Sequence, residues 1–329
     1  QSVIIPTYNR KEMLAEALNS VLNQSQKSLE ILIIDDCSTD GTEEFVKTIS
    51  DSRVHYFRNE KNSGPEFNRS YGLRQSRGKY ITFLDDDDYY TDYDFFSKAI
   101  KIFEEHDSEN APLSFVCANA ESFRVDLGKR STKHNIGTPG RVKGVDYILK
   151  RKKPHSTFPT VFKAEILRKA GLDNLMIFDT ETYIEAALYG DAYFMSDYVG
   201  VYRLHKESIT LGYTHNPGNE SRYYAKALEN TRRNKLIAEK LYTMADKEQV
   251  RKWYIKSLVG TIEYARLRMN NETRNKIFIH IFRQSGFMPR FWIAFLWHFI
   301  KRQLRKITPL RKVYRFIKYR GKVPEDDLI

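Results

Sequence analysis

Four consecutive carboxylates, Asp85 to Asp88, follow the apolar run "YITFL". That run is rich in aromatic and β-branched residues, which predicts a buried strand that ends at the acids. Adjacent carboxylates repel one another. A divalent cation such as Mg²⁺ or Mn²⁺ offsets the repulsion, and phosphate oxygens commonly complete its coordination. The alternative is a solvated acidic turn that caps the next helix.

An extended backbone would divide these four acids into two pairs, because alternate side chains of an extended segment face the same side. Asp85 and Asp87 are therefore predicted to share the side that holds the metal. Asp86 and Asp88 are expected on the opposite side, where they would serve the turn and the helix that follows it.

Two further acids, Asp35 and Asp36, end the β-rich run Glu30–Asp35. A carboxylate at the end of such a strand can accept hydrogen bonds from a nucleotide base or ribose, and Asp36 is the preferred candidate. The alternative is a turn and helix cap, which residues 38–41 would supply well. The chain contains neither the Gly-rich dinucleotide fingerprint nor the P-loop motif, so neither kind of site is supported.

The elements that must position these residues alternate between strands and helices. Strands are predicted at Ser2–Ile5, Glu30–Asp35, Val54–Phe57 and Lys79–Leu84, and helices at Lys11–Gln24, Gly41–Ser50, Asn68–Ser76 and Tyr93–His106. This alternation predicts βαβ units and a mainly parallel sheet, in which ligands bind at the carboxyl ends of the strands. Three predicted strands are followed by chemically loaded segments, "PTYNR", "DDCSTDG" and "DDDDYY".

The second half of the chain is less regular. A strand is predicted at Ser114–Ala120, a long loop at Gly128–Lys153, and helices at Arg222–Leu241 and Lys247–Arg268. A boundary near residue 215 would separate an α/β domain, residues 1–215, from a helical region, residues 216–329. Cys37 and Cys117 are the only cysteines, which argues against a disulfide scaffold or zinc site and suits a reducing cytoplasm.

The net charge of +12 arises in the C-terminal tail. Residues 283–324 contain 12 Lys and Arg and no acid, so 54 − 12 = 42 basic residues balance the 42 acids elsewhere. The apolar run 290–300 within this tail is too short to span a bilayer. Large apolar residues among basic ones are typical of a helix that lies on an anionic membrane surface. The alternatives are a core helix or a subunit contact in a homo-oligomer; nothing in the first half supports nucleic-acid binding.

Four motifs together resemble the family 2 glycosyltransferases: "SVIIPTYNR", "ILIIDDCSTDGT", "NSGPEFNRSYGL" and "GKYITFLDDDD". The resemblance implies a GT-A fold, which has a Rossmann-like, mainly parallel sheet flanked by helices, here followed by a C-terminal helical region. It also implies transfer from a nucleotide-activated sugar with inversion at the anomeric carbon.

The resemblance also assigns residues to the donor site. The loop for uracil and ribose corresponds to Pro6, Thr7, Tyr8 and Asn9, with Asp36 facing the base; Asn62, Gly64 and Arg69 lie beside the nucleotide, and Asp85 and Asp86 join them. The metal pair corresponds to Asp85 and Asp87. Where the family commonly reads "ARN", this chain has Asn68-Arg69-Ser70 and keeps only the arginine.

Two downstream segments complete the resemblance. In "IFDTETYIEAALYGD", Asp179 takes the position of the catalytic base, Phe178 replaces the usual glutamate, and Glu181 is a substitute base; helix-start acids favoured by the helix dipole are the alternative. In "YRLHKESITLG", His205 corresponds to a third metal ligand, and Arg203, Lys206 and Ser208 to residues that hold the diphosphate. The alternative for His205 is an ordinary polar loop residue.

These observations predict an inverting, metal-dependent glycosyltransferase. With Mn²⁺ or Mg²⁺, it would move a sugar from a UDP-sugar to a hydroxyl of a glycan acceptor, lipid-linked or part of a cell-surface polysaccharide, and form a β-glycosidic bond. It would act in the cytoplasm, peripherally on the inner face of the cell membrane. One rival is a sugar nucleotidyltransferase, which should carry a Gly-rich loop where "PTYNRKEM" has no glycine. The other is a non-catalytic module that binds nucleotide or glycan at the membrane.

Overall fold

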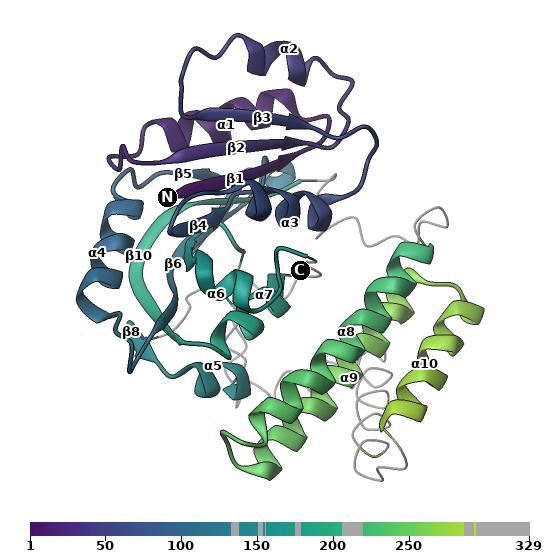
Figure 1. The fold of residues 1–329 in the computed structure, drawn as a ribbon. Helices are drawn as coiled ribbons and strands as arrows, with labels where there is room; N and C mark the ends of the chain where they lie inside the picture. Colours follow the sequence, from purple (N-terminus) through teal and green to yellow (C-terminus); the bar gives the residue numbers. More distant parts are fainter. Residues whose placement is uncertain are drawn as a thin grey trace. The chain divides into compact units, whose positions relative to one another are not determined.

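The computed structural model describes residues 1–132, 138–150, 154, 156–174, 179–205, 220–285 and 293. The chain divides into two compact units (Figure 1). The first comprises Gln1–Tyr213 with Thr243–Ala245, and the second Thr214–Tyr242 with Asp246–Ile329. The boundary predicted near residue 215 lies among residues 206–219, outside the described part of the chain.

The first unit is built on one sheet with the strand order β3-β2-β1-β4-β9-β6-β10-β5, to which β7 adds on β6 and β8 on β10. The strands are β1 (Ser2–Thr7), β2 (Glu30–Asp35), β3 (Val54–Arg58), β4 (Tyr80–Phe83), β5 (Tyr89–Tyr90), β6 (Leu113–Arg124), β7 (Lys129–Ser131), β8 (Gly140–Val142), β9 (Thr160–Lys163) and β10 (Asp191–Leu204). Strands β1 to β4 are parallel to one another, as predicted. Strand β9 runs antiparallel to both β4 and β6, so the whole sheet is mixed.

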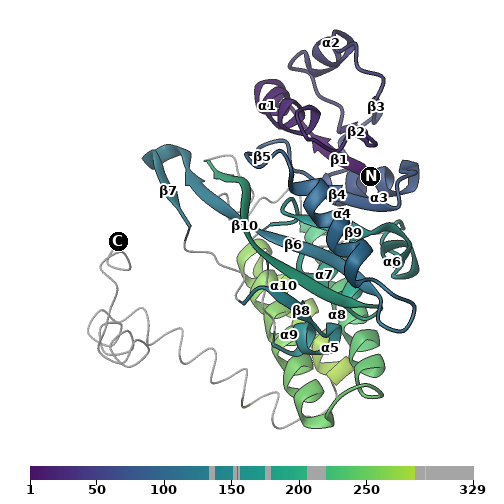
Figure 2. The same cartoon turned by 90° about the vertical axis from the view of Figure 1, so that its left-hand side faces the viewer.

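The difference between the two halves of the sheet follows from their connections. Parallel neighbours need a crossover, and helices α1 (Lys11–Leu22), α2 (Thr42–Lys47) and α3 (Pro65–Gln75) provide one after each of the first three strands. After β6 the chain instead turns back through β7, which pairs antiparallel with β6. The long strands β6 and β10 then lie side by side in parallel (Figure 2).

Both faces of β1, β2 and β4 are buried, which explains their continuous apolar runs. Val3 and Ile5 of β1 belong to the core that α1 and α4 (Phe95–His106) cover. Ile4 points to the opposite face, where α3 packs against it at Gly72. On that face the rings of Phe115 and Tyr183 meet edge to face, joining β6 to α7 (Asp179–Ala187).

The prediction of a long loop at residues 128–153 is wrong. The structure places β7, β8 and α5 (Gly144–Lys150) in this range. Strand β8 pairs with β10, and α5 packs so closely that a Cβ on Gly144 would lie 2.0 Å from the carbonyl oxygen of Ala187. These elements owe their form to long-range partners, which a local pattern does not reveal. Helix α6 (Ala164–Lys169) follows β9 directly.

The second unit contains three described helices, α8 (Glu220–Leu241), α9 (Lys247–Arg268) and α10 (Asn271–Ser285). The first two match the helices predicted at 222–241 and 247–268. Helix α9 begins at an N-cap, since the side chain of Asp246 accepts a 3.0 Å hydrogen bond from the Gln249 amide. No helix among the described residues is long and apolar enough to cross a membrane. The basic tail beyond residue 285 lies outside the described residues, apart from Ile293.

The close approach of α3 to β1 gives a stability test. A Cβ on Gly72 would lie 2.4 Å from Cγ2 of the fully buried Ile4, so Gly72→Ala should lower the free energy of unfolding by about 1–3 kcal/mol through overpacking. The control is Gly260→Ala in α9, where a Cβ meets nothing within 4 Å; it should raise stability by up to about 1 kcal/mol. Urea unfolding measures both, and a Gly72→Ala variant as stable as the parent would contradict this packing.

Candidate active site

The predicted site residues converge at one edge of the sheet. Because β1, β2 and β4 are parallel, their carboxyl ends lie together; Thr7 at the end of β1 is level with Asp35 at the end of β2. The four acids Asp85–Asp88, here called the acid turn, follow β4 at the same edge. The convergence expected from the sequence is therefore present.

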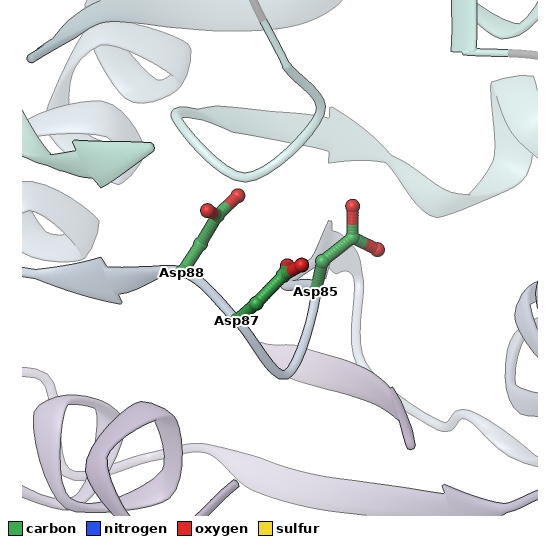
Figure 3. A group of neighbouring side chains, drawn as sticks. All are labelled: Asp85, Asp87 and Asp88. Atoms are coloured by element: carbon green, nitrogen blue, oxygen red, sulfur yellow. The ribbon is translucent and has the colours of Figure 1, made fainter. Parts of the chain in front are cut away.

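The acid turn is a tight turn and not an extended segment. The amide of Asp88 donates a 3.0 Å hydrogen bond to the carbonyl of Asp85, which closes the turn across Asp86 and Asp87. The predicted alternation is consequently wrong for Asp88. One carboxylate oxygen from each of Asp85, Asp87 and Asp88 lies within 4.8 Å of the other two (Figure 3). Asp88 does not cap the next helix either, because α4 begins at Phe95 with Asp94 as its N-cap residue.

Asp86 joins the acid turn to the segment that follows β1. Its Oδ2 accepts hydrogen bonds from the Thr7 hydroxyl at 2.9 Å and from the Tyr8 amide at 3.4 Å. Its Oδ1 accepts one from Arg10 Nη1 at 3.0 Å. Burial raises the pKa of Asp86 to about 6, although the charge of Arg10 works against the rise. Asp86 thus holds the predicted nucleotide loop in place.

Asp87 is brought together with His205, the predicted third metal ligand, although this histidine is not part of the cluster formed by Asp85, Asp87 and Asp88. Asp87 Oδ2 lies 3.0 Å from His205 Nε2 and accepts a 3.0 Å hydrogen bond from Arg10 Nη1. Burial would raise the pKa of Asp87, but the hydrogen bond with His205 and the charge of Arg10 outweigh it, so the pKa is lowered. Asp87 is therefore the carboxylate of the turn that the surroundings hold most firmly as an anion.

Asp88 provides the clearest test of whether a cation fits. The residue is fully buried, and its Oδ1 accepts the Arg203 amide at 3.0 Å. Its Oδ2 is buried without a hydrogen-bond partner among the described residues. Burial, together with the charges of Asp87 and Asp85, raises the pKa of Asp88 well above its usual value. A desolvated oxygen beside two other carboxylates is a donor set that suits Mg²⁺ or Mn²⁺.

Arg203, near the end of β10, connects that strand to the acid turn and to α1. Its guanidinium donates to the backbone carbonyl of Asp87 and to Glu16 of α1, and it lies 5.0 Å from the ring centroid of Tyr89. This buried arginine sets the position of β10, which carries His205 at its end. In this arrangement its charge is engaged between α1 and the turn. Lys206 and Ser208, predicted beside it, lie outside the described residues.

Asp36 organises the loop that follows β3. Its Oδ1 accepts hydrogen bonds from Asn59 Nδ2 at 2.9 Å and the Ser63 amide at 2.7 Å, and its Oδ2 accepts one from the Gly64 amide at 2.7 Å. A carboxylate offers about four acceptor positions, and the described residues occupy three of them on this buried side chain. Gly64 has a φ of 86°, which favours glycine at this point. Asn62 lies exposed on the same loop.

The segments after β1 and β2 are tied together by Asn9. Its Oδ1 accepts a 2.7 Å hydrogen bond from the Thr39 backbone amide, and its own backbone amide donates one to Ser38 Oγ at 2.9 Å. Pro6 is buried within β1, whereas Tyr8 is 46% exposed. The predicted loop therefore offers one aromatic ring to solvent above a fixed backbone.

Arg69 reaches the second half of the chain. It donates from Nη2 to Asp85 Oδ1 and from Nη1 to Asp179 Oδ1, the latter at 2.9 Å. Burial works to lower the pKa of Arg69, but the charges of Asp85 and Asp179 outweigh it and raise the pKa. Asp179 is the first residue of α7, and Glu181 is partly exposed on the same first turn. Phe178 lies outside the described residues.

Three residues of this assembly are not among the predicted site residues. Arg10, which bridges Asp86 and Asp87, directly follows the "PTYN" motif, and its position next to that motif was the available signal. Glu16 and Asn59 carry no local signal, because their partners are distant in sequence. The structure brings together the described predicted residues of the acid turn, the "PTYN" loop, the Asp36 loop, Arg69, Asp179 and His205.

Residues 2–175 match the family model of glycosyl transferase family 2. The chain is 30% identical over 237 residues to the GalNAc(5)-diNAcBac-PP-undecaprenol beta-1,3-glucosyltransferase of Campylobacter jejuni, with 70% of this chain and 74% of that protein covered. It is 40% identical over 89 residues to the UDP-Glc:alpha-D-GlcNAc-diphosphoundecaprenol beta-1,3-glucosyltransferase WfaP of Escherichia coli, covering 27% of this chain and 36% of that one. The chain belongs to glycosyl transferase family 2, and it is a glycosyltransferase.

Solved structures confirm the GT-A fold. The Staphylococcus aureus protein TarS, crystallised with UDP-GlcNAc, has a TM-score of 0.56 at 20% identity, with 81% of this chain and 82% of that chain covered. The mannosyltransferase PcManGT of Pyrobaculum calidifontis, solved with GDP-Man and Mn²⁺, has a TM-score of 0.51 at 17% identity, with 94% and 81% covered. At these identities the similarity is one of fold.

The geometry of the acid turn predicts a measurable cation affinity. Asp87→Asn should weaken Mn²⁺ binding at least about tenfold, because it removes a charged oxygen donor from the cluster of three carboxylates. The matched control is Asp92→Asn, a nearby acid that pairs with Lys98 on the surface. Electron paramagnetic resonance of free Mn²⁺ measures the affinity, and equal Mn²⁺ binding by the parent and Asp87→Asn would remove Asp87 from the site.

Proposed function

We propose that this glycosyltransferase moves a sugar from a UDP-sugar to a hydroxyl of a glycan acceptor, with inversion and with the help of Mn²⁺ or Mg²⁺. One observation carries the proposal. The acid turn, the Tyr8 loop (the segment after β1) and the Asp36 loop (the segment after β3 that Asp36 holds) lie at one edge of the sheet, and Arg69 joins that edge to Asp179. A donor site and a carboxylate suited to proton abstraction are thereby held in one assembly.

The donor half of the proposal rests on the two loops. The remaining acceptor position of Asp36 would receive an N–H group of the uracil, and the exposed ring of Tyr8 offers a face for the base. The names of relatives support a uridine nucleotide, since TarS was crystallised with UDP-GlcNAc and WfaP is described as using UDP-Glc. PcManGT contains GDP-Man, so similarity of fold alone does not select the base.

In the proposed reaction the acceptor hydroxyl attacks the anomeric carbon and displaces the nucleoside diphosphate. Asp179 accepts the hydroxyl proton as the new C–O bond forms and the bond to the diphosphate oxygen breaks. Asp85, Asp87, Asp88 and His205 would hold the cation, which supplies positive charge to the leaving diphosphate. A single displacement converts an α-linked donor into a β-linked product. Glu181 is the alternative base on the same first turn of α7.

A lipid-linked acceptor is favoured by the two curated relatives, both of which are named as acting on undecaprenol-linked glycans. We propose that the enzyme meets such an acceptor at the inner face of the membrane. The described residues next to the basic tail agree with a surface location, because Ile279 and Phe282 of α10 are exposed beside Arg283. Exposed apolar side chains among basic ones suit an anionic lipid surface.

The base assignment is tested by transfer assays with a panel of UDP-sugars. Transfer should stop with EDTA and return with Mn²⁺, and Asp179→Asn should lower kcat by about 10²–10⁴, the range that general-base catalysis contributes. Glu181→Gln is the matched variant and should retain most activity. Full activity of Asp179→Asn with loss in Glu181→Gln would move the base to Glu181. Formation of UTP and a sugar 1-phosphate when pyrophosphate is added to the UDP-sugar, with no transfer to an acceptor, would instead support a nucleotidyltransferase.

The membrane assignment is tested by co-sedimentation with vesicles. Deleting residues 290–329 should abolish binding to vesicles that contain anionic lipid while leaving the circular dichroism of the remaining chain unchanged. A subtler variant replaces Lys301, Arg302, Arg305 and Lys306 with glutamine and should weaken binding strongly, because each basic residue near the surface contributes about 1 kcal/mol. Undiminished vesicle binding after the deletion would refute the assignment, and a loss of oligomers would assign the tail to a subunit contact.

A further inference from the structure

Arg69 bridges two carboxylates from distant parts of the chain. Its side chain is 10% exposed and lies between Asp85 and Asp179, whose side chains are 28% and 36% exposed. One terminal nitrogen serves each carboxylate. The buried guanidinium therefore contacts two partly exposed acids at once: Asp85, proposed to bind the donor, and Asp179, proposed to act on the acceptor.

The bridge has few other supports. Arg69 Nε is buried and finds no acceptor among the described residues, so the orientation of the guanidinium depends on the two carboxylates. The orientation of Asp179 depends in turn on Arg69, because Asp179 is the first residue of α7 and its side chain is partly exposed. The helix itself is anchored one turn later, where the Tyr183 hydroxyl lies 2.6 Å from Thr160 Oγ1 and donates to the Ser156 carbonyl.

From this geometry we infer that Arg69 is a positioning residue for proton transfer. It holds Asp179 by Oδ1, so that Oδ2 is directed to the acceptor hydroxyl, and it fixes this orientation relative to Asp85 in the donor site. The inference rests on the proposed function, since it gives Asp179 the role of base. A planar fork with two terminal nitrogens can serve two carboxylates in fixed geometry, whereas a lysine ammonium acts as a point charge.

The test uses the full chain as Arg69→Lys, Asp179→Asn and the double variant. The control is Arg74→Lys, one turn further along α3, where the arginine packs on Phe67 and Tyr71 and donates to the Asp173 carbonyl. Urea unfolding without ligand gives the first readout. If the bridge exists, the two substitutions are non-additive, and the combined change in the unfolding equilibrium constant differs from the product of the single changes by at least about threefold.

Kinetics give the second readout, which a merely structural ion pair would not produce. Arg69→Lys should lower kcat about 100-fold, the loss that a misplacement of about 1 Å can cause, while the KM for the UDP-sugar stays within about threefold. The double variant should be no slower than Asp179→Asn by more than about threefold, because both changes affect one step. Arg74→Lys should match the parent.

The outcomes separate the inference from the function on which it rests. If the two substitutions are additive in unfolding and the parent enzyme transfers sugar, the inference about Arg69 is overturned and the proposed function still stands. A raised KM for the donor with an unchanged kcat also overturns the inference, because Arg69 would then only bind nucleotide. If the two substitutions are non-additive in unfolding but the parent protein transfers no sugar, the proposed function is overturned, and with it the catalytic role of Arg69.

Discussion

The repulsion among four adjacent carboxylates at the end of a core strand is the constraint on which this site depends. Leaving a buried charge without its partner costs about 3–5 kcal/mol, so each acid of the turn must be matched from elsewhere in the fold. Arg10 matches Asp86 and Asp87, Arg69 matches Asp85, and the Arg203 amide serves Asp88. Because these partners come from the β1 loop, α3 and β10, stabilising the acid turn requires the whole edge of the sheet to assemble.

The same constraint explains how the site gains its chemistry. Asp85, Asp87 and Asp88 each place one carboxylate oxygen close to the others. Asp88 Oδ2 is buried and has no hydrogen-bond partner among the described residues. The protein thus satisfies most of the turn and leaves a gap that a divalent cation suits. The segment after β1, which we propose contacts the donor, is fixed through the same turn, since Asp86 accepts a hydrogen bond from the Tyr8 amide. Membership of glycosyl transferase family 2 agrees with this division of roles.

Much of the first half of the fold could be predicted from sequence, because its elements are set by local patterns. The strand Glu30–Asp35 was predicted with its observed bounds, and Asp85 and Asp87 were selected correctly as neighbours. The turn across Asp86 and Asp87 was missed because the prediction assumed an extended backbone. The Arg69–Asp179 pair spans 110 residues, and a contact at that separation has no signature in a single sequence. The loop prediction for residues 128–153 was wrong for the same reason, because β7 and β8 form by pairing with strands distant in sequence.

The central claim is that the acid turn is the cation site on which the donor's diphosphate is held. It is tested most directly by a crystal structure of the protein with UDP and Mn²⁺, with the metal located by its anomalous scattering. The account predicts one peak about 2 Å from carboxylate oxygens of the acid turn and from a diphosphate oxygen, with Asp88 Oδ2 or Asp87 among the ligands. A diphosphate bound at this edge with no anomalous peak at the turn, or with the metal held elsewhere, would contradict it.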